Sequence, residues 1–568
     1  MAKTRRKKTT KTPAAPMPTP QPGEKIWLVH LPFGMKDKAA TYRKELKRHI
    51  VVAGQLPEHL QPYAAHPYSY EAWIQDQLNK EPEPTLHAHA TKKTPRPDQL
   101  EDARSIVEAC AAGWRGMYVG SGVGTGKTIA CIIAAKAVCH LRGGNTVVVS
   151  TDRPFSMTSA HWRASIAAVG DGGLRWIIIS SDGGLKQLMA PNGQPRINPT
   201  VYIADEAHQF RRNSQRTARM RRLARLNQAP GTKIPFTISV TATPGHSPAE
   251  YRYLSALLAQ IHGEHPKDWD NIGQKLADKG LPFEQSFGNW VWDKQAANSG
   301  ELRDEATSQV RDWMLNTSPP VMLNRQPAWG AAELNGIPVD LSPDERAKYL
   351  MQWGDFQREM RLARQGKDQA AGLAALTRFR QKCSYLRIDS TVERVKTDVE
   401  NGYQVLVSVE HVSTGAQPIA DTLEDAGIPV ARLYGGRDDM EDQRLAFQRG
   451  HAKVAVLTIT SSVSLHANEV LPDGNKATSA QRKGYMHQAR YSGLLATQIM
   501  GRAHRDHQTC EWALLYATNT VEEKAATRMV DRLSTIATSV DADRSNLESI
   551  AALFGADWLP ASKALGEE

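Results

Sequence analysis

Short apolar runs alternate with helical stretches along most of this chain. The runs in the N-terminal half are rich in β-branched residues, and helical stretches such as residues 128–141 separate them. They are MYV (117–119), TVVVS (146–150), WIIIS (176–180), VYIA (201–204) and FTISV (236–240). Continuous apolar strands between helices are typical of a parallel sheet that helices cover on both faces. The pattern therefore predicts an α/β unit in this part of the chain.

The same rhythm returns in the C-terminal half after an interruption. Its apolar runs are YQVLVSV (403–409), PVARL (429–433), KVAVLTI (453–459) and EWALLYA (511–517). Residues 246–335, between the two halves, lack the rhythm and contain many tryptophans and helical stretches. We therefore expect two similar parallel-sheet lobes that face each other across a cleft.

By composition and pattern the chain divides into six segments. Residues 1–24 are basic and then rich in Thr and Pro, which is typical of disorder. Residues 25–93 combine one strand pattern with frequent Pro and His, and they predict a small accessory domain of unknown role. The remaining segments are a first lobe at 94–245, a helical linker or insertion at 246–335, a second lobe at 336–534 and a C-terminal helical tail at 535–568.

Composition favours a packed protein that stays inside the cell. The chain has 568 residues, 40% of them hydrophobic, and no apolar run approaches the roughly 20 residues that a membrane span needs. No apolar segment follows the basic N-terminus, as one would in a secretory signal. The five cysteines are scattered without a CxxC pair, which indicates reduced thiols and no zinc site. We expect no membrane partner and a cytoplasmic location, which for a viral protein means the host cytoplasm.

Positive charge is concentrated in two segments. Lys and Arg total 71 against 60 Asp and Glu, a formal net charge of +11. Residues 1–24 carry six cations and one acid, and a solvated end explains them as well as a function in phosphate attraction or in targeting does. Residues 211–225 contain seven Arg and no acid, spread over several helical faces. Since no acid compensates them locally, contact with nucleic acid is favoured there over a solvated helix.

A glycine-rich stretch, SGVGTGKT at 121–128, lies between a predicted strand and a predicted helix. Glycines let a backbone curl so that its N–H groups point at phosphate oxygens, and the helix N-terminus adds its dipole. In such a loop Lys127 would contact the β- and γ-phosphates of a nucleotide, and Thr128 would bind Mg²⁺. Ser121 departs from the strict pattern, which has Gly at that position. The other nucleotide-binding candidates are the remaining loop residues Gly122, Val123, Gly124, Thr125 and Gly126.

Two adjacent acids end a predicted strand, in IADEAH at 203–208. A carboxylate at this end of the strand would face the phosphate loop, where Mg²⁺ needs an anionic ligand. Asp205 would hold the metal, and Glu206 would orient and deprotonate an attacking water. A third stretch, SVTATP, also ends a strand, and the hydroxyl groups of Thr241 and Thr243 could relay the state of the phosphate site.

Two arginines in the second lobe could supply the remaining charge. Hydrolysis needs cations that neutralise charge developing on the γ-phosphate, and an Arg supplied from across a cleft contributes several powers of ten in rate. In QIMGRAHRDHQ, at 498–508, Arg502 and Arg505 lie three residues apart, so on a helix both would point across the cleft. Gln498 is the first residue of the same stretch.

The order SGVGTGKT, DEAH, TATP and QxxGRxxR resembles motifs I, II, III and VI of superfamily 2 helicases, over about residues 94–530. QIMGRAHRDHQ is most similar to the Swi/Snf-type DNA translocase branch. The resemblance implies two RecA-like lobes with ATP and Mg²⁺ as cofactors, and it implies that Gln99, in RPDQ, reads the adenine base. The catalytic residues that it implies are Lys127, Asp205, Glu206, Gln498, Arg502 and Arg505. Weaker similarities are Arg212 and Asn213, His161 and Trp162, Arg325, Gly435 and Gly436, and Arg444.

The chain departs from that branch in its fifth motif. SSVSLHA, at 461–467, has Ser464 and His466 where the branch has Gly and Asn. In that branch the motif couples ATP to nucleic-acid contact, so the departure bears on the efficiency of stepping. Residues 467–497 match no motif, and their cations include Lys476, Arg482, Lys483 and Arg490.

These motifs predict an ATP-dependent DNA helicase or DNA translocase that acts in replication, repair or recombination. The alternatives are an RNA helicase, a nucleic-acid-binding scaffold without catalysis, and the motor subunit of a restriction system. DNA, single- or double-stranded, is the expected partner and RNA the alternative, while the sequence identifies no protein partner. Strand separation stays open, because no wedge element is recognisable. Four tryptophans could stack on bases, although buried packing is favoured: Trp290, Trp292, Trp313 and Trp329.

Overall fold

The computed structural model describes residues 17–538 with gaps. The gaps are 33, 44–45, 80–93, 154, 232–233, 287, 331, 367–368, 436, 438, 459–463, 472, 490–492, 524, 528, 530–532 and 534–537. Most of both tails, the end of the accessory domain, Gly436, Arg490 and part of the fifth motif therefore lie outside the described residues. Within the part that is described, no helix is both long and apolar enough to cross a membrane.

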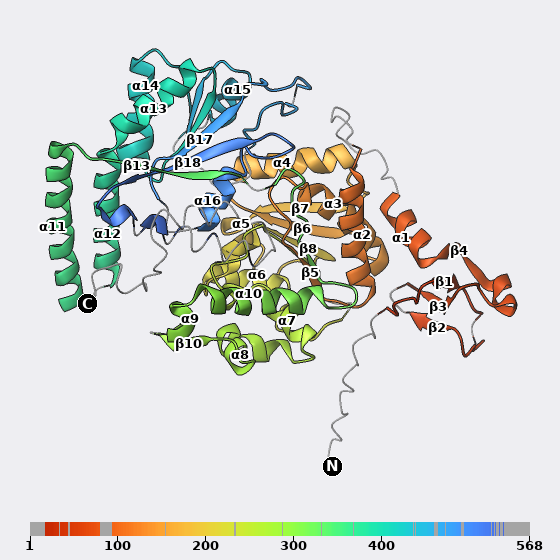
Figure 1. The fold of residues 1–568 in the computed structure, drawn as a ribbon. Coiled ribbons are helices and arrows are strands. Elements are labelled where there is room, and N and C mark those ends of the chain that lie inside the picture. The colour runs from red at the N-terminus through yellow and green to blue at the C-terminus, as the bar shows by residue number, and fades with distance from the viewer. Residues whose placement is uncertain are drawn as a thin grey trace.

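The first lobe is a six-stranded sheet, parallel throughout, with helices on both faces (Figure 1). Its strands run in the order β12-β5-β9-β8-β6-β7. They are β5 (Gly116–Val119), β6 (Thr146–Thr151), β7 (Arg175–Ser180), β8 (Val201–Asp205), β9 (Phe236–Val240) and β12 (Met322–Leu323). The helices on one face are α2 (Pro97–Ala111), α3 (Lys127–Arg142) and α4 (Phe155–Val169). Those on the other include α5 (Gly183–Gln187) and α6 (Gln215–Leu223), with the 3-10 turn η2 (Ala207–Phe210) between them in the chain.

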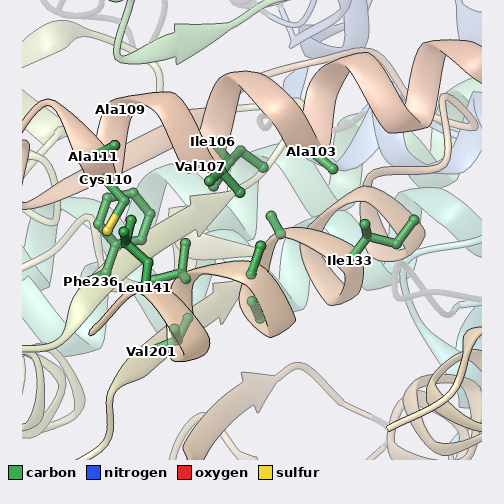
Figure 2. Close-up of a cluster of buried hydrophobic side chains, with 14 of the residues drawn as sticks. Ala103, Ile106, Val107, Ala109, Cys110, Ala111, Ile133, Leu141, Val201 and Phe236 are labelled. Carbon is green, nitrogen blue, oxygen red and sulfur yellow. The ribbon is translucent and has the colours of Figure 1, made fainter. Parts of the chain in front are cut away.

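Alternate residues of the central strands enter two different cores. In β6, Val147 and Val149 pack on the α3 side, while Val148 faces the opposite core. Successive side chains of a strand point to opposite faces, so a strand covered on both sides is apolar at every position. Figure 2 shows the core on the α2 side, where Ile106 and Val107 project from α2 toward α3.

The second lobe repeats this arrangement, with strands in the order β13-β18-β17-β14-β16-β15, again all parallel. The strands are β13 (Leu334–Val339), β14 (Gln404–Ser408), β15 (Val430–Leu433), β16 (Val454–Leu457), β17 (Arg482–Met486) and β18 (Cys510–Ala517). The helices that cover them are α13 (Ile388–Glu400) and α14 (Gln417–Asp425) on one face, with the π-helix η5 (Val412–Ala416), and α15 (Met440–Gln448) and α16 (Gly493–Met500) on the other. A helical hairpin, α11 (Pro343–Gln365) and α12 (Gln369–Tyr385), lies beside the lobe and has its own small core. The predicted fold class, two parallel-sheet α/β lobes of the RecA-like kind, is confirmed.

The segment after β9 is built onto the first lobe. Its β12 extends the sheet beside β5, and Leu254, Trp269 and Val310 share a core with Tyr202 of β8. Residues 246–323, the larger part of the stretch 246–335 that the apolar pattern set apart as a linker or insertion, thus pack as part of the first lobe. The elements of this segment are η3 (Pro248–Glu250), α7 (Ser255–Ile261), η4 (Pro266–Trp269), α8 (Ile272–Asp278), β10 (Phe283–Ser286), β11 (Asn289–Trp292), α9 (Lys294–Ala297) and α10 (Gly300–Leu315).

A small antiparallel sheet precedes the first lobe and packs against it. Its strand order is β2-β3-β1-β4, and α1 (Tyr70–Asn79) joins it to the rest of the chain. Leu28, Ile50 and Ile74 belong to the same buried core as α2 and α3. The other elements are β1 (Lys25–Val29), β2 (Thr41–Arg43), β3 (Arg48–Ala53), η1 (Glu58–Tyr63) and β4 (Ala64–Ser69).

Candidate nucleotide site between the two lobes

The glycine-rich loop joins β5 to α3 and ends at the first turn of that helix. Gly124 and Gly126 have φ values of 85° and 86°, in the left-handed region that residues with side chains disfavour. A Cβ on Gly126 would also collide with the side-chain amide of Gln99. Glycine at both positions therefore lets the backbone take this left-handed path into the N-terminus of the 16-residue helix α3, and at Gly126 it leaves room for Gln99.

Lys127 is the first residue of α3, and its ammonium group folds back onto the loop. Nζ donates hydrogen bonds to the carbonyl oxygens of Ser121 (2.8 Å) and Gly122 (2.7 Å). Loss of hydration lowers the pKa of Lys127 to about 8, although the charge of Glu206 acts in the opposite direction. Thr128, the candidate metal ligand, follows in the same helical turn.

Ser121 holds the chain that leaves the first lobe against the loop. Its hydroxyl accepts a hydrogen bond from the backbone N of Arg325 at 3.2 Å, and Gly122 N donates to the Arg325 carbonyl at 2.9 Å. The Arg325 guanidinium group then binds Asp102 (2.9 Å) and Glu101 (2.7 Å) on α2. A glycine at position 121, as in the strict motif, could not supply this hydroxyl.

Gln99 lies beside the loop in the first turn of α2. Its Oε1 accepts a hydrogen bond from Arg96 N at 3.0 Å, and its amide nitrogen faces Gly126. Arg96 Nη2 donates to the carbonyl of Thr125 at 2.7 Å, so both ends of RPDQ contact the loop. The structure brings Gln99 to the nucleotide loop, while its role in reading adenine stays a prediction. The sequence singled out Gln99 in RPDQ and did not predict that Arg96 contacts the loop.

Asp205 ends β8, two strands from the strand that leads into the loop. Its Oδ2 accepts hydrogen bonds from Trp162 Nε1 at 2.8 Å and from Thr151 Oγ1 at 3.2 Å. Burial, and after it the charge of Glu206, raises the pKa of Asp205 to about 6. Trp162 and Thr151 therefore orient the candidate metal ligand. Of the two, only Trp162 carried a signal in the sequence, as one of the weaker similarities.

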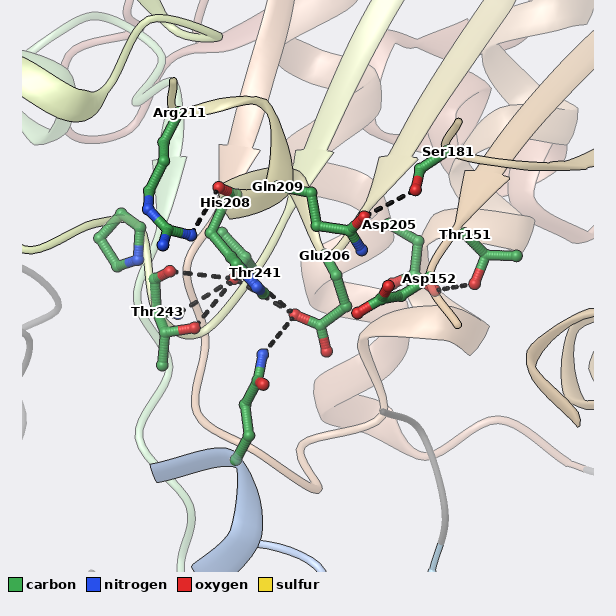
Figure 3. A network of polar contacts seen from close by, with 12 residues as sticks. Thr151, Asp152, Ser181, Asp205, Glu206, His208, Gln209, Arg211, Thr241 and Thr243 are labelled. Atoms are coloured by element: carbon green, nitrogen blue, oxygen red, sulfur yellow. Dashed lines mark hydrogen bonds and ion pairs between the residues drawn. The ribbon is translucent and has the colours of Figure 1, made fainter. Parts of the chain in front are cut away.

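Glu206 has a φ of 51°, a left-handed conformation that is strained for a residue with a side chain. Its Oε2 lies 3.1 Å from Gln498 Nε2, 3.3 Å from His208 Nδ1 and 3.4 Å from Thr241 Oγ1 (Figure 3). Burial opposes ionisation, but the contact with His208 and the charge of Arg502 outweigh it and lower the pKa of Glu206 to about 2. The two adjacent acids are thus shifted in opposite directions, and Glu206 is the one kept ionised, so its carboxylate can orient a water molecule.

Thr241 connects Glu206 to the end of β9. Besides its contact with the acid, Oγ1 lies 3.0 Å from His208 Nδ1 and accepts a hydrogen bond from Thr243 N at 3.1 Å. The SVTATP stretch therefore reaches Glu206, while its relay of the state of the phosphate site stays a prediction.

The second lobe reaches this site through the end of α16. Gln498 lies on that helix, so its hydrogen bond to Glu206 joins the two lobes. Gly501 follows the helix, and a Cβ there would collide with the side chain of Val123 in the loop. Glycine at this position therefore permits the close approach of the lobes.

Arg502 and Arg505 lie in turns after α16. They do not share one face of a helix, because the helix ends at Met500 and Arg505 pairs with Gln508 in an isolated bridge. Both arginines nevertheless face the first lobe. Arg502 is buried and its charge acts on Glu206, while a Cβ on Gly124 would lie 2.9 Å from Arg505 Cβ.

The Arg-rich segment 211–225 is largely tied into the fold. No acid within the stretch balances its arginines, but acids far away in the sequence pair with three of them. The pairs are Arg211 with Glu250 (3.4 Å), Arg219 with Asp182 (3.5 Å) and Arg221 with Asp270. Arg212 and Arg222 have exposed side chains and stay candidates for contact with nucleic acid.

The remaining sequence candidates mostly have structural roles. Trp290, Trp292 and Trp313 border the core of the first lobe, as favoured, whereas Trp329 lies over the loop, 2.7 Å from the position of a Cβ on Gly124. The unmatched stretch 467–497 contains β17. In that strand the buried Arg482 packs over the ring of Phe447, and Lys483 Nζ lies 2.9 Å from Asp398 Oδ1.

The groups around the loop fit a magnesium–triphosphate. A helix N-terminus, Lys127 and two arginines would attract phosphate oxygens. The oxygens of Asp205 and Thr128 are the kind of ligand that Mg²⁺ prefers. The arrangement can therefore bind phosphate, hold a divalent cation and accept a proton from water.

Comparison with protein-family profiles finds no match, and comparison with curated proteins finds none either. Among solved structures, one similar chain is the SWI2/SNF2 ATPase core of Sulfolobus solfataricus in complex with double-stranded DNA. It is 13% identical with a TM-score of 0.31, and the match covers 81% of this chain and 100% of that chain.

Proposed function

We propose that this chain is an ATP hydrolase, stimulated by nucleic acid, that moves along DNA. The observation that carries the proposal is the hydrogen bond between Gln498 of the second lobe and Glu206 of the first, with Arg505 set against the same phosphate loop. Because groups from both lobes meet at one site, hydrolysis depends on how the lobes sit against each other. A strand bound across both lobes would then be moved as they close and open.

Each residue at the site has a distinct role in this proposal. The loop N–H groups and Lys127 bind the phosphates, and Asp205 with Thr128 holds Mg²⁺, which when bound neutralises phosphate charge. Glu206 orients a water molecule and takes its proton at the carboxylate. The second-lobe residues act on that pair: Gln498 orients Glu206, and Arg502 and Arg505 neutralise charge that develops on the terminal phosphate.

DNA is the proposed partner, single- or double-stranded. The order of the motifs, the Swi/Snf-like form of QIMGRAHRDHQ and the formal charge of +11 support it. The proposed setting is replication, repair or recombination in the cytoplasm, or in the host cytoplasm for a viral protein. The intact set of loop lysine, paired acids and arginines argues against a scaffold without catalysis.

ATP turnover measured side by side with single-stranded DNA, duplex DNA, forks and RNA tests the proposal. We expect DNA to stimulate turnover more than RNA does. Stimulation by RNA alone would instead support an RNA helicase. The absence of turnover with every partner would support a nucleic-acid-binding scaffold without catalysis.

The outcome of movement is tested with two substrates in the presence of ATP. A triplex on duplex DNA reports tracking along a duplex, and a forked duplex with a fluorophore and a quencher reports strand separation. Displacement of the third strand without fork opening supports a duplex translocase, and fork opening supports a helicase. If neither substrate reacts, the proposal that the protein moves along DNA is contradicted.

A further inference from the structure

His466, which stands where the similar branch has Asn, joins two parts of the second lobe. Only 8% of its side chain is exposed, and its two ring nitrogens face different partners. Nδ1 lies 2.6 Å from Ser464 Oγ, and Nε2 lies 3.5 Å from a carboxylate oxygen of Asp506. Asp506 directly follows Arg505, and the same oxygen lies 3.9 Å from Arg505 Nε. Both residues that depart from the fifth motif thus belong to one chain of contacts that ends at the arginine turn.

The backbone around His466 is fixed from two sides. On the side of the arginine turn, Leu465 N donates to the carbonyl of Arg502 at 2.8 Å. The contacts with the body of the lobe are Arg444 Nη1 to Ser464 O (3.3 Å), Gln448 Nε2 to His466 O (3.1 Å) and Arg482 Nε to Leu465 O (3.2 Å). Residues 464–466 therefore connect the second-lobe core to the turn that carries the arginines, with hydrogen bonds on both sides.

The turn at Arg505–His507 needs contacts that hold its backbone. Asp506 and His507 have φ values of 53° and 62°, so two consecutive residues with side chains adopt the left-handed conformation. A residue with a side chain is strained in this conformation and keeps it only when the surrounding contacts fix it. The contact of Asp506 with His466 is one of the contacts that can fix it, and Arg505 immediately precedes the strained pair.

The charges around His466 select one form of its ring. Burial, and then the positive charges of Arg505, Arg482 and Arg444, lower the pKa of His466 to about 4, although Asp506 acts in the opposite direction. The ring is thus neutral at neutral pH, with one N–H and one acceptor nitrogen. A carboxylate can only accept, so the N–H belongs on Nε2 toward Asp506, and Nδ1 accepts from the Ser464 hydroxyl.

This arrangement differs from that of a hydrolytic Ser–His–Asp triad. In such a triad the histidine must take the proton of the serine, which needs a basic imidazole. The arginines around His466 remove that basicity, so the ring can orient its neighbours and cannot activate Ser464.

We infer that Ser464, His466 and Asp506 form a positioning relay that holds Arg505 against the phosphate loop. The relay replaces the Gly and Asn of the similar branch and rests on the proposed ATP hydrolysis. An asparagine at position 466 is too short to span both partners, whereas an imidazole ring reaches Ser464 on one side and Asp506 on the other.

A matched pair of variants tests the relay through turnover. The amide of His466→Gln can take the place of Nε2 and keep the contact with Asp506, whereas the amide of His466→Asn can take only the place of Nδ1. We expect His466→Asn to lower DNA-stimulated kcat by about tenfold or more, because small misplacement of a catalytic group is costly, with the KM for ATP and the affinity for DNA unchanged. His466→Gln should recover most of the loss, and Ser464→Ala should lower kcat less than His466→Asn does.

The outcomes separate the relay from the proposed function. If the unchanged protein hydrolyses ATP and both His466 variants match it, the relay is overturned and the function stands. Equal losses in both variants, with lowered unfolding temperatures, would also overturn the relay in favour of a packing role.

A second measurement does not depend on hydrolysis. In protein labelled with ¹⁵N-histidine, the His466 ring signals are identified by their loss in His466→Gln. We expect the ring to be neutral at about pH 6, with its proton on Nε2. An ordinary histidine, with a pKa of about 6.5, is mostly charged at that pH. A charged ring at that pH, or a proton on Nδ1, would overturn the relay whatever the turnover of the protein.

Discussion

The two halves of the candidate nucleotide site are built in different ways. The first-lobe half lies at the ends of parallel strands, and each acid there is oriented by hydrogen bonds from its own lobe, such as that of Trp162 to Asp205. The second-lobe half consists of the end of one helix and the turns after it, and Gln498 is the residue that bonds directly to the candidate catalytic acid Glu206. Under the proposed function, we expect the first lobe to bind a nucleotide by itself and turnover to need both lobes. Substitutions in the two halves should therefore affect different steps.

The largest effects are expected in the first lobe. Lys127→Ala removes the cation of the loop and should abolish both nucleotide binding and turnover. Glu206→Gln keeps the shape of the side chain but removes the proton acceptor, so it should lower turnover by about 10²–10⁴-fold while a fluorescent ATP analogue still binds. Circular dichroism should show both variants folded. Turnover at the wild-type rate in either one would contradict the assignment of the site.

The second-lobe arginines should affect turnover alone. Replacing Arg502 or Arg505 by Ala should lower kcat by about tenfold or more and leave nucleotide and DNA binding intact, because these groups act on developing charge. Arg175→Ala, at an exposed arginine that begins β7 at the end of the strand away from the loop, is the control for a simple loss of charge. Loss of DNA binding with normal turnover would instead identify Arg502 and Arg505 as contacts with the phosphate backbone of DNA.

A smaller effect is expected behind the metal ligand. Trp162→Phe keeps a ring in the core but removes the N–H that donates to Asp205. Loss of such an orienting group typically lowers metal affinity by about 10–100-fold, so turnover should need correspondingly more Mg²⁺ and recover at saturation. Trp292→Phe is the matched control, because Trp292 stacks on Phe283 in another part of the lobe. An unchanged Mg²⁺ dependence in Trp162→Phe would contradict the proposed metal position.

The smallest effect is expected from the basic tail, which belongs to neither half of the site. Deleting residues 2–12 removes six cations, so the dependence of DNA affinity on salt should become shallower. ATP turnover at saturating DNA should stay unchanged. An unchanged salt dependence would return the tail to the alternative of a solvated end or a targeting signal.

The sequence predicted the two sheets because their strands are buried on both faces and are therefore apolar at every position. It also located the groups at the strand ends, since the carboxyl ends of parallel strands meet at one edge of a sheet. Lys127, Asp205 and Glu206 were found in this way. Gln498, Arg502 and Arg505 were predicted from a motif, and the structure brings Gln498 and Arg502 to Glu206 and Arg505 to the loop.

What the sequence could not predict depends on partners that are distant in the chain. The arginines of 211–225 appeared unbalanced because Asp182, Glu250 and Asp270 lie outside that stretch. β12 is only two residues long, too short to show a strand period, so its place in the first sheet became visible only through its pairing with β5. Ser121 looked like a defect in a motif until its contact with Arg325, some 204 positions away, showed what the hydroxyl does.

If two lobes form one hydrolytic site, nucleic acid bound across them should control ATP turnover. The decisive measurement is ATP turnover of the unchanged protein with Mg²⁺, with and without duplex DNA. We expect low turnover without DNA and a clear rise on its addition, both removed by Glu206→Gln. Turnover that neither duplex DNA nor any other nucleic acid changes would contradict this coupling. The absence of turnover under all of these conditions would contradict it as well.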